Sequence, residues 1–198
     1  MPTRILRFAL ALALAAPAFA QDAELPEAGP IKAADYQPFT SARGTFACDV
    51  PTAGWVVLEE ETPSGSAAHI LGPAEEGGRW RAGLHVHFMD KTQPGFLPID
   101  DAVKRERRSD ASATRSASPV RRVHVNRRSA RCFEVTETRL LPPDRLPAAP
   151  SILHHYFAFV PAGDGYFIIK LSSSRETYLD HRGLFEQILR TFRVLGAS

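Results

Sequence analysis

Two histidines separated by one residue, His85 and His87, are the side chains of this sequence whose spacing suits metal binding. In an extended chain such residues project from the same face, so both imidazoles would point the same way. A zinc site needs three or four protein ligands, and two ring nitrogens leave it incomplete. His69, His154 and His155 would complete it if their strands were neighbours, which the sequence leaves open. We therefore predict no metal or other cofactor and keep His85 and His87 as the candidate ligands. Their alternative role is packing beneath a helix or contact with solvent.

A second group of side chains suits anion binding. The segment 104–131 carries ten basic residues against two acidic ones. Such a cluster creates a positive field that attracts a phospholipid head group, a cell-wall polymer or an acidic protein. The candidate anion-binding residues are Arg121, Arg122, Arg127 and Arg128. Because side chains alternate along a strand, Arg121 and Arg122 would face opposite sides, so the alternative is a solvated surface balanced by 59–61, a run of three glutamates.

Motifs of nucleophilic and metal-assisted hydrolysis are missing from the sequence. It contains no Gly-x-Ser-x-Gly elbow and no His-Glu-x-x-His, and the serines of 64–66 lie in a Pro- and Gly-rich stretch without a strand-to-helix context. The pair Gly77-Gly78 indicates a turn and not a phosphate-binding loop. Scattered Ser, His and Asp residues could converge in space, but their order does not predict it. We predict that the chain is not an enzyme.

The two cysteines, Cys48 and Cys132, allow two interpretations. In an oxidising compartment they could form a disulfide that stabilises the fold. Alternatively, both are small buried thiols, because Cys is among the residues most often found inside proteins. No C-x-x-C spacing points to a redox role.

The first twenty residues have the organisation of a secretory signal peptide. Arg4 and Arg7 form a positive start, an apolar run covers 8–16, and 18–20 is a small-x-small cleavage motif, so the mature chain is predicted to begin near Gln21. The apolar run is shorter than the ~20 residues that span a bilayer. We expect a periplasmic or secreted protein that is not an integral membrane protein.

The charge balance gives no reason to expect a nucleic-acid partner. The sequence has 24 Lys and Arg against 22 Asp and Glu, and the signal segment holds two of the basic residues and no acidic one. The mature chain is therefore balanced, and such a chain does not attract nucleic acid through its net charge.

Three regions are predicted along the chain: the signal peptide at 1–20, a flexible lead-in at 21–40 and a single folded domain at 41–196. The lead-in contains three prolines and no apolar period. The residues that follow are enough to bury the core of one domain.

Apolar residues at every second position predict strands from Gly44 onwards. The predicted strands cover 46–50, 55–58, 68–71, 82–89, 120–125, 130–138, 152–160 and 166–171. Turn residues near 126–129 and at 161–165 predict two antiparallel hairpins. The second hairpin is predicted at the sheet centre, because its strands are apolar at nearly every position. A short helix is expected at 102–108, and loops at 109–118 and 141–150.

The last element is predicted to be an amphipathic helix. Asp180 can cap it, and Leu179 and Leu184 stand at the positions of a hydrophobic staple. One face carries Leu184, Phe185, Ile188, Leu189 and Phe192. That stripe needs a sheet to cover, so strands followed by a packing helix predict an α+β domain around an antiparallel sheet.

The order of these elements resembles the PsbP-like domain family. The opening Gly44-Thr45-Phe46, Val50-Pro51 and Gly54-Trp55 is similar to the first hairpin of these domains, and 166–171 followed by 178–192 is similar to their final strand and helix. The resemblance covers roughly residues 40 to 195. It implies an α/β/α sandwich with a central antiparallel sheet and a C-terminal packing helix. Its members include extrinsic photosystem subunits, a nuclear-import factor that binds a small GTPase, and exported bacterial proteins, and it supplies no shared catalytic motif.

We expect an exported, non-catalytic binding or accessory protein of the bacterial cell envelope that acts through protein–protein contact. The predicted partner is a cell-envelope protein, with an anionic surface as the second candidate. One alternative is an envelope enzyme or small-ligand carrier with a pocket between sheet and helix, lined by Tyr156, His154 or His85. The other is anion binding through 104–131.

Overall fold

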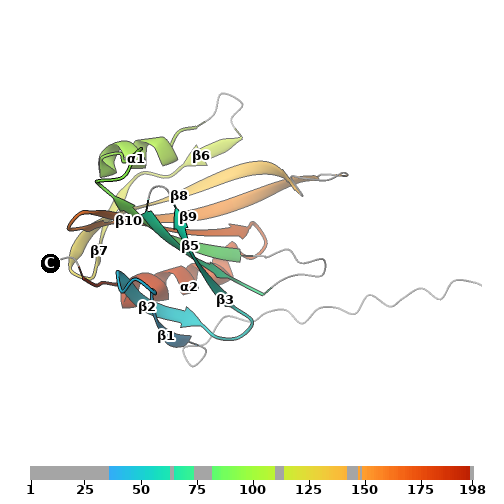
Figure 1. The fold of residues 1–198 in the computed structure, drawn as a ribbon. Coiled ribbons are helices and arrows are strands. Elements are labelled where there is room, and N and C mark those ends of the chain that lie inside the picture. Colours follow the sequence, from blue (N-terminus) through green and yellow to red (C-terminus); the bar gives the residue numbers. More distant parts are fainter. Residues whose placement is uncertain are drawn as a thin grey trace, which may run out of the picture.

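Figure 1 presents the computed structural model of the chain, which describes residues 36–62, 65–73, 82–109, 114–141, 147 and 149–196. The predicted signal peptide and its cleavage site lie outside these residues. Within them the chain forms eleven strands and two helices, so the predicted α+β class is confirmed.

The larger sheet contains eight antiparallel strands. In spatial order they are β3 (Val56–Thr62), β4 (Gly65–Leu71), β5 (Ala82–Asp90), β10 (Gly165–Ser174), β9 (Ala149–Ala162), β8 (Arg128–Leu141) and β6 (Arg115–Ala117), and β7 (Arg121–Val125) also pairs with β8. The two predicted hairpins are confirmed as β7–β8 and β9–β10. The second occupies the sheet centre, because both faces of its apolar strands are covered.

The two edges of this sheet differ. β6 and β7 pair with successive parts of β8, so they lie end to end along one edge. A loop is predicted at 109–118, but residues 115–117 form a short edge strand. The opposite edge is β3, where Val56 and Leu58 are exposed.

A smaller sheet consists of β1 (Tyr36–Thr40), β2 (Phe46–Pro51) and β11 (Arg193–Val194). The prediction of a flexible lead-in is wrong for 36–40, which pairs in full with β2. The sequence pattern does not predict this strand because Pro38 lies within it, but proline is tolerated on an edge strand. The Phe39 ring also contacts Phe46, with 5.9 Å between ring centroids.

The helices lie on opposite sides of the larger sheet (Figure 1). Helix α1 (Ile99–Glu106) packs Ala102 and Val103 against one face. Helix α2 (Tyr178–Thr191) and the smaller sheet cover the other face. Successive residues of the central strands point alternately towards the α1 side and the α2 side of the sheet. Along β9, for example, Phe157 lies on the α1 side and Tyr156 on the α2 side.

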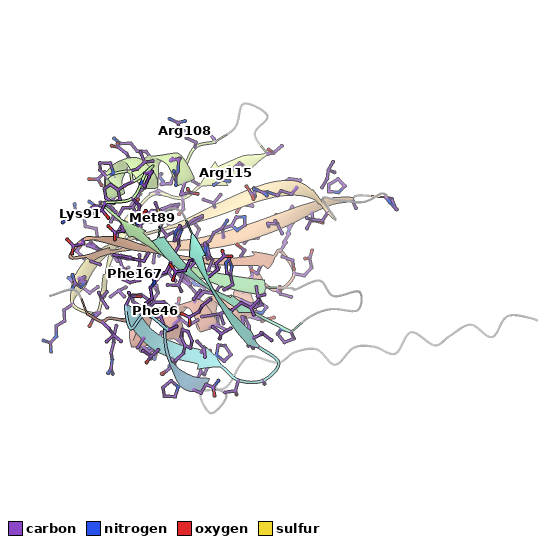
Figure 2. All side chains as sticks on the ribbon, viewed as in Figure 1. Phe46, Met89, Lys91, Arg108, Arg115 and Phe167 are labelled. Carbon is purple, nitrogen blue, oxygen red and sulfur yellow. The ribbon has the colours of Figure 1, made fainter. Side chains whose placement is uncertain are left out.

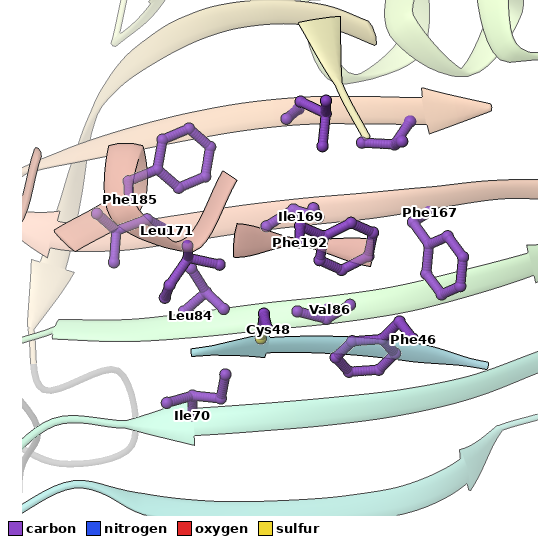
Figure 3. Packing of buried hydrophobic residues seen from close by; sticks show 14 of the residues in the cluster. Phe46, Cys48, Ile70, Leu84, Val86, Phe167, Ile169, Leu171, Phe185 and Phe192 are labelled. Atoms are coloured by element: carbon purple, nitrogen blue, oxygen red, sulfur yellow. The ribbon is translucent and has the colours of Figure 1, made fainter. Parts of the chain in front are cut away.

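The core on the α2 side is built around aromatic rings (Figure 3). Phe192, just after α2, stacks on Phe46 of β2 at 5.4 Å and meets Phe167 of β10 edge-on at 5.3 Å. Phe46 and Phe167, both labelled in Figure 2, also contact each other, with 5.7 Å between ring centroids. These three rings join the smaller sheet, the helix and the larger sheet.

The start of α2 differs from the prediction. The cap residue is Thr177, which makes no side-chain cap hydrogen bond, and Asp180 lies inside the first turn. Leu179 is 62% exposed while Leu184 is buried, so the predicted staple between them is not formed. The helix starts earlier than predicted because Tyr178 already packs on the core, with its ring stacked on His154 at 4.1 Å. Among the described residues, no helix has the length and apolar character needed to cross a membrane.

Candidate functional site

The α1 side of the molecule carries a concave surface of about 500 Å³ between α1 and the β7–β8 hairpin, which we call the basic groove. Its lining residues are Asp100, Val103, Lys104, Arg107, Val120, Arg122 and Arg131. Buried Ala102 and Val103 hold α1 against the sheet and leave Lys104 and Arg107 at the groove. Four cationic side chains and one carboxylate therefore share one concave surface.

The β7–β8 hairpin places two of these cations face to face. Arg122 is directly opposite Arg131 in the antiparallel register. The turn between the strands has positive φ at Asn126 and Arg127, the backbone of a tight two-residue hairpin turn, which fixes this register. Like charges directly opposite each other are destabilising, so this pair favours the approach of a negative group.

One partner of this pair has a counter-ion and the other does not. Arg131 is only 23% exposed and binds the Asp100 carboxylate at 2.9 Å. Arg122 is exposed and has no ion-pair partner among the residues that the structure describes. Its guanidinium is therefore free to bind an external carboxylate or phosphate, for which its fork of donors is well suited.

The other two cations differ in how firmly they are held. Arg107 donates from Nε to the Ser118 carbonyl at 3.2 Å, and its guanidinium lies over the Phe133 ring at 5.9 Å. Lys104 is 76% exposed and pairs with Asp101 at 3.1 Å, a contact that solvent weakens. The groove thus combines two cations held by contacts with the protein, Arg107 and Arg131, with two exposed cations, Lys104 and Arg122.

The four predicted anion-binding arginines do not gather at one place. Arg122 lines the basic groove, whereas Arg121 lies on the opposite face and pairs with Glu134 at 3.2 Å. Arg127 forms the hairpin turn and Arg128 follows it at the start of β8. The opposite orientation of Arg121 and Arg122 agrees with the predicted alternation. Lys104, Arg107 and Arg131 belong to the arginine-rich segment 104–131 but are not among its four candidates, because packing of α1 on β8 brings them into the groove.

The acidic run 59–61 does not balance the groove. Glu59 accepts a hydrogen bond from the Ala42 amide at 3.0 Å, and Glu61 pairs with Arg43 at 2.6 Å. Glu60 contacts His69 at 2.9 Å. These glutamates belong to the opposite edge of the sheet, so they leave the groove positive.

The predicted histidine candidates form a stack of rings. His69 of β4 is in register with His85 of β5, and their ring centroids are 4.5 Å apart with nearly parallel planes. His87 follows at 5.5 Å from His85. Stacked planes do not direct three nitrogens at one point, and in the part of the chain that the structure describes no group of three or more His, Cys, Asp or Glu side chains could hold a metal. Burial, together with the neighbouring His69 and His87, lowers the pKa of His85 to about 4.

The other two candidate histidines, His154 and His155, lie elsewhere. His154 stacks on Tyr178 on the α2 side, and His155 lies on β9, separated from β5 by β10. Neither extends the stack of His69, His85 and His87.

A buried polar network on the α1 side joins three strands. Nδ1 of His155 forms a hydrogen bond with the Ser172 hydroxyl at 2.8 Å, and Nε2 of His155 forms one with Glu137 Oε1 at 3.0 Å. Arg115 and Arg139 bind the same carboxylate at 2.7 and 2.6 Å. Burial alone would raise the pKa of Glu137, but His155, Arg139 and Arg115 together hold it below its ordinary value.

This order of serine, histidine and acid is that of a hydrolase triad, but its setting is different. His155 is 4% exposed, and burial lowers its pKa to about 4. Two arginines occupy the carboxylate, and none of these side chains lines the basic groove. The network satisfies polar groups inside the sheet, which is the usual role of buried hydrogen-bonded side chains.

The two cysteines are free and buried. Cys48 of β2 and Cys132 of β8 contribute to the same core on the α2 side, and Figure 3 shows Cys48 among its neighbours. The structure therefore contains the two buried thiols and not the disulfide.

A second concave region of about 150 Å³ lies between α2 and the strands β7, β8 and β9. We call it the α2 pocket. Of the residues named for a pocket between sheet and helix, Tyr156 lines it, and neither His154 nor His85 does.

Comparison with known proteins identifies the fold. No protein-family model matches the chain, and no curated protein matches it in sequence. Its structure is similar to cyanobacterial PsbP (CyanoP) from Synechocystis sp. PCC 6803, with 15% identity, 86% of this chain and 98% of the other covered, and a TM-score of 0.50. The Ran-binding protein Mog1p of Saccharomyces cerevisiae has 11% identity, coverage of 80% and 95%, and a TM-score of 0.47. The chain has a PsbP-like fold, as the resemblance predicted.

Proposed function

We propose that this chain is an exported, non-catalytic binding protein of the cell envelope, which acts by holding an acidic segment of a partner protein in the basic groove. The observation that carries the proposal is the pair of arginines facing each other across β7 and β8, of which only Arg131 has a counter-ion. A carboxylate placed between Arg122 and Lys104 would relieve the repulsion and complete the charge balance.

The lining of the basic groove suits the binding of a peptide carboxylate better than it suits catalysis. Its polar groups are four cations and one carboxylate, and none of its lining residues is a histidine, serine or cysteine. Such a set binds and orients negative charge, and its one carboxylate, Asp100, is already engaged by Arg131 at 2.9 Å. The PsbP-like fold acts here as a rigid support, with α1, the sheet and α2 as the three layers of the α/β/α sandwich.

Export is the second part of the proposal. The signal-peptide pattern of 1–20 supports release of a mature chain that begins near Gln21, passes through the lead-in and folds as a single domain up to residue 196. Partners available to such a chain are proteins of the envelope. An anionic surface, such as phospholipid or cell-wall polymer, is the competing occupant of the groove.

Fluorescence anisotropy with a labelled oligoglutamate peptide tests the groove directly. We expect the purified protein to bind the peptide at low salt and more weakly as salt is added, because the charges are exposed. Arg122→Glu should weaken binding about tenfold or more, equivalent to about 1.4 kcal/mol. Arg190→Glu is the matched control, since Arg190 is exposed on α2 on the other side of the sheet.

The result of this experiment distinguishes a protein partner from an anionic surface as the occupant of the basic groove. Equal loss of affinity in both variants, or no binding at low salt, contradicts the proposal. Anionic phospholipid vesicles that bind more tightly than the peptide, with the same loss in Arg122→Glu, would assign the groove to a surface instead. Crosslinking in envelope extracts then identifies the protein partner as the one retained by Arg190→Glu and lost with Arg122→Glu.

A further inference from the structure

The basic groove already contains a carboxylate that belongs to the protein. Asp100 lies in the first turn of α1 and lines the groove, and its carboxylate is 2.9 Å from the Arg131 guanidinium. Arg131 belongs to β8, so this ion pair joins the helix wall of the groove to the sheet wall. A ligand carboxylate that approaches Arg131 therefore meets a group of its own kind in place.

The two partners of this ion pair differ in exposure. The Asp100 side chain is 67% exposed, whereas the Arg131 side chain is 23% exposed. Arg131 also lies on a strand that is paired on both sides, opposite Arg122 of β7 and Phe159 of β9. Rotation of the exposed Asp100 side chain moves its carboxylate into water, while the guanidinium keeps its place. Displacement of Asp100 by a ligand therefore requires no change in the fold.

Asp100 compensates the repulsion between two like charges. Arg122 and Arg131 face each other directly across β7 and β8, and Asp100 neutralises one of them. The first turn of a helix is also a favourable position for a negative charge. An acidic ligand offers the same compensation from outside, so the ligand and Asp100 are alternatives at Arg131. The ligand then gains only the difference between the ion pair that it forms and the one that it breaks.

We propose that Asp100 is an intramolecular competitor for Arg131, which lowers the affinity of the basic groove for acidic segments. The inference rests on the proposed function and concerns the regulation of that same site. While Asp100 holds Arg131, the exposed cations Arg122 and Lys104 are the groove residues that a ligand meets first. Removal of the Asp100 charge releases the Arg131 guanidinium, whose fork of donors suits a carboxylate.

Asp100→Asn tests the competition, because asparagine keeps the shape of the side chain and loses its charge. We expect the purified variant to bind the labelled oligoglutamate peptide about threefold to fivefold more tightly than the original protein at low salt, the equivalent of one partly exposed ion pair. Fluorescence anisotropy measures the affinity, and the melting temperature confirms that the variant is folded. Glu186→Gln is the matched control and should change the affinity much less, since it removes a carboxylate that pairs with Arg182 at 3.1 Å on α2, on the other side of the sheet.

A double-mutant cycle separates competition from a change in net charge. If Asp100 acts through Arg131, the gain from Asp100→Asn should depend on Arg131, because substitutions of residues in contact are not additive. In the Arg131→Gln background we expect Asp100→Asn to raise the affinity by less than about twofold. A purely long-range effect of the charge, or a structural effect of the substitution on α1, would raise the affinity equally in both backgrounds.

The results distinguish this inference from the proposed function. Weaker binding by Arg122→Glu with no gain in Asp100→Asn overturns the competition and leaves the site for an acidic segment intact. An equal gain in both backgrounds of the cycle, or in Glu186→Gln, overturns the competition as well. If Arg122→Glu binds the peptide as tightly as the original protein, or if no variant binds it at low salt, the proposed function fails and this inference fails with it.

Discussion

At the scale of single residues, the buried imidazole of His155 makes stability depend on pH. Burial lowers its pKa in the folded chain to about 4, below the ordinary value of 6.5. Between these values the unfolded chain binds a proton that the folded chain does not, so stability is present at neutral pH and falls as pH drops from 6.5 towards 4. Glu137 acts in the same direction at lower pH, because its folded pKa is also depressed.

We predict that acidification from pH 7 to pH 4.5 lowers the free energy of unfolding by about 2–3 kcal/mol through His155 alone. Urea unfolding at several pH values measures this loss. His155→Gln should be less stable at pH 7, and its loss on acidification should be smaller by about 2–3 kcal/mol, while the share that comes from His85 remains. His124→Asn, at an exposed position on β7, should retain the full pH dependence. If the free energy of unfolding of His155→Gln fell by as much as that of the original protein between pH 7 and pH 4.5, the assignment of this loss to His155 would be wrong.

The cysteines give a second prediction at this scale. Burial raises the pKa of Cys48 to about 12 and that of Cys132 to about 11, so both are protonated and unreactive in the folded chain. A thiol reagent should label neither cysteine in native protein recovered from its own compartment. After unfolding without reductant it should label both. Labelling of none after unfolding would mean that the disulfide had formed.

At the scale of elements, α2 is held by the residue that follows it. Phe192 is 1% exposed and contacts both Phe46 and Phe167. We predict that Phe192→Ala lowers the free energy of unfolding by about 3–5 kcal/mol. Leu179→Ala, at the exposed start of the helix, should change it by less than about 0.5 kcal/mol. Urea denaturation of the two variants measures both, and a large loss in Leu179→Ala would restore the predicted staple.

Elements with strong local signals were predicted well from the sequence. The β9–β10 hairpin is two apolar runs joined by turn residues, and α2 has a regular apolar stripe, so neighbours along the chain decide both. β1 and β6 were missed because they are short edge strands. Their pairing with β2 and β8 depends on residues distant in the sequence. In addition, Pro38 lies within β1 and is typical of a linker sequence.

At the scale of the whole molecule, the sites depend on contacts that no short segment encodes. The arginine-rich segment was visible in the sequence, but the basic groove requires α1 to pack on the sheet beside Arg122 and Arg131. The network of Ser172, His155 and Glu137 takes one residue from each of three strands. Alternation along a strand predicts which side a residue faces, whereas strand order decides which residues meet.

The order of strands gives the larger sheet two unlike edges. The short strands β6 and β7 share one edge, whereas the longer β3 forms the other and exposes Val56 and Leu58. The three glutamates that follow on β3 repel a second copy of the same strand, a common device against edge-to-edge aggregation. These carboxylates thus contribute to keeping separate copies of the protein apart along this border.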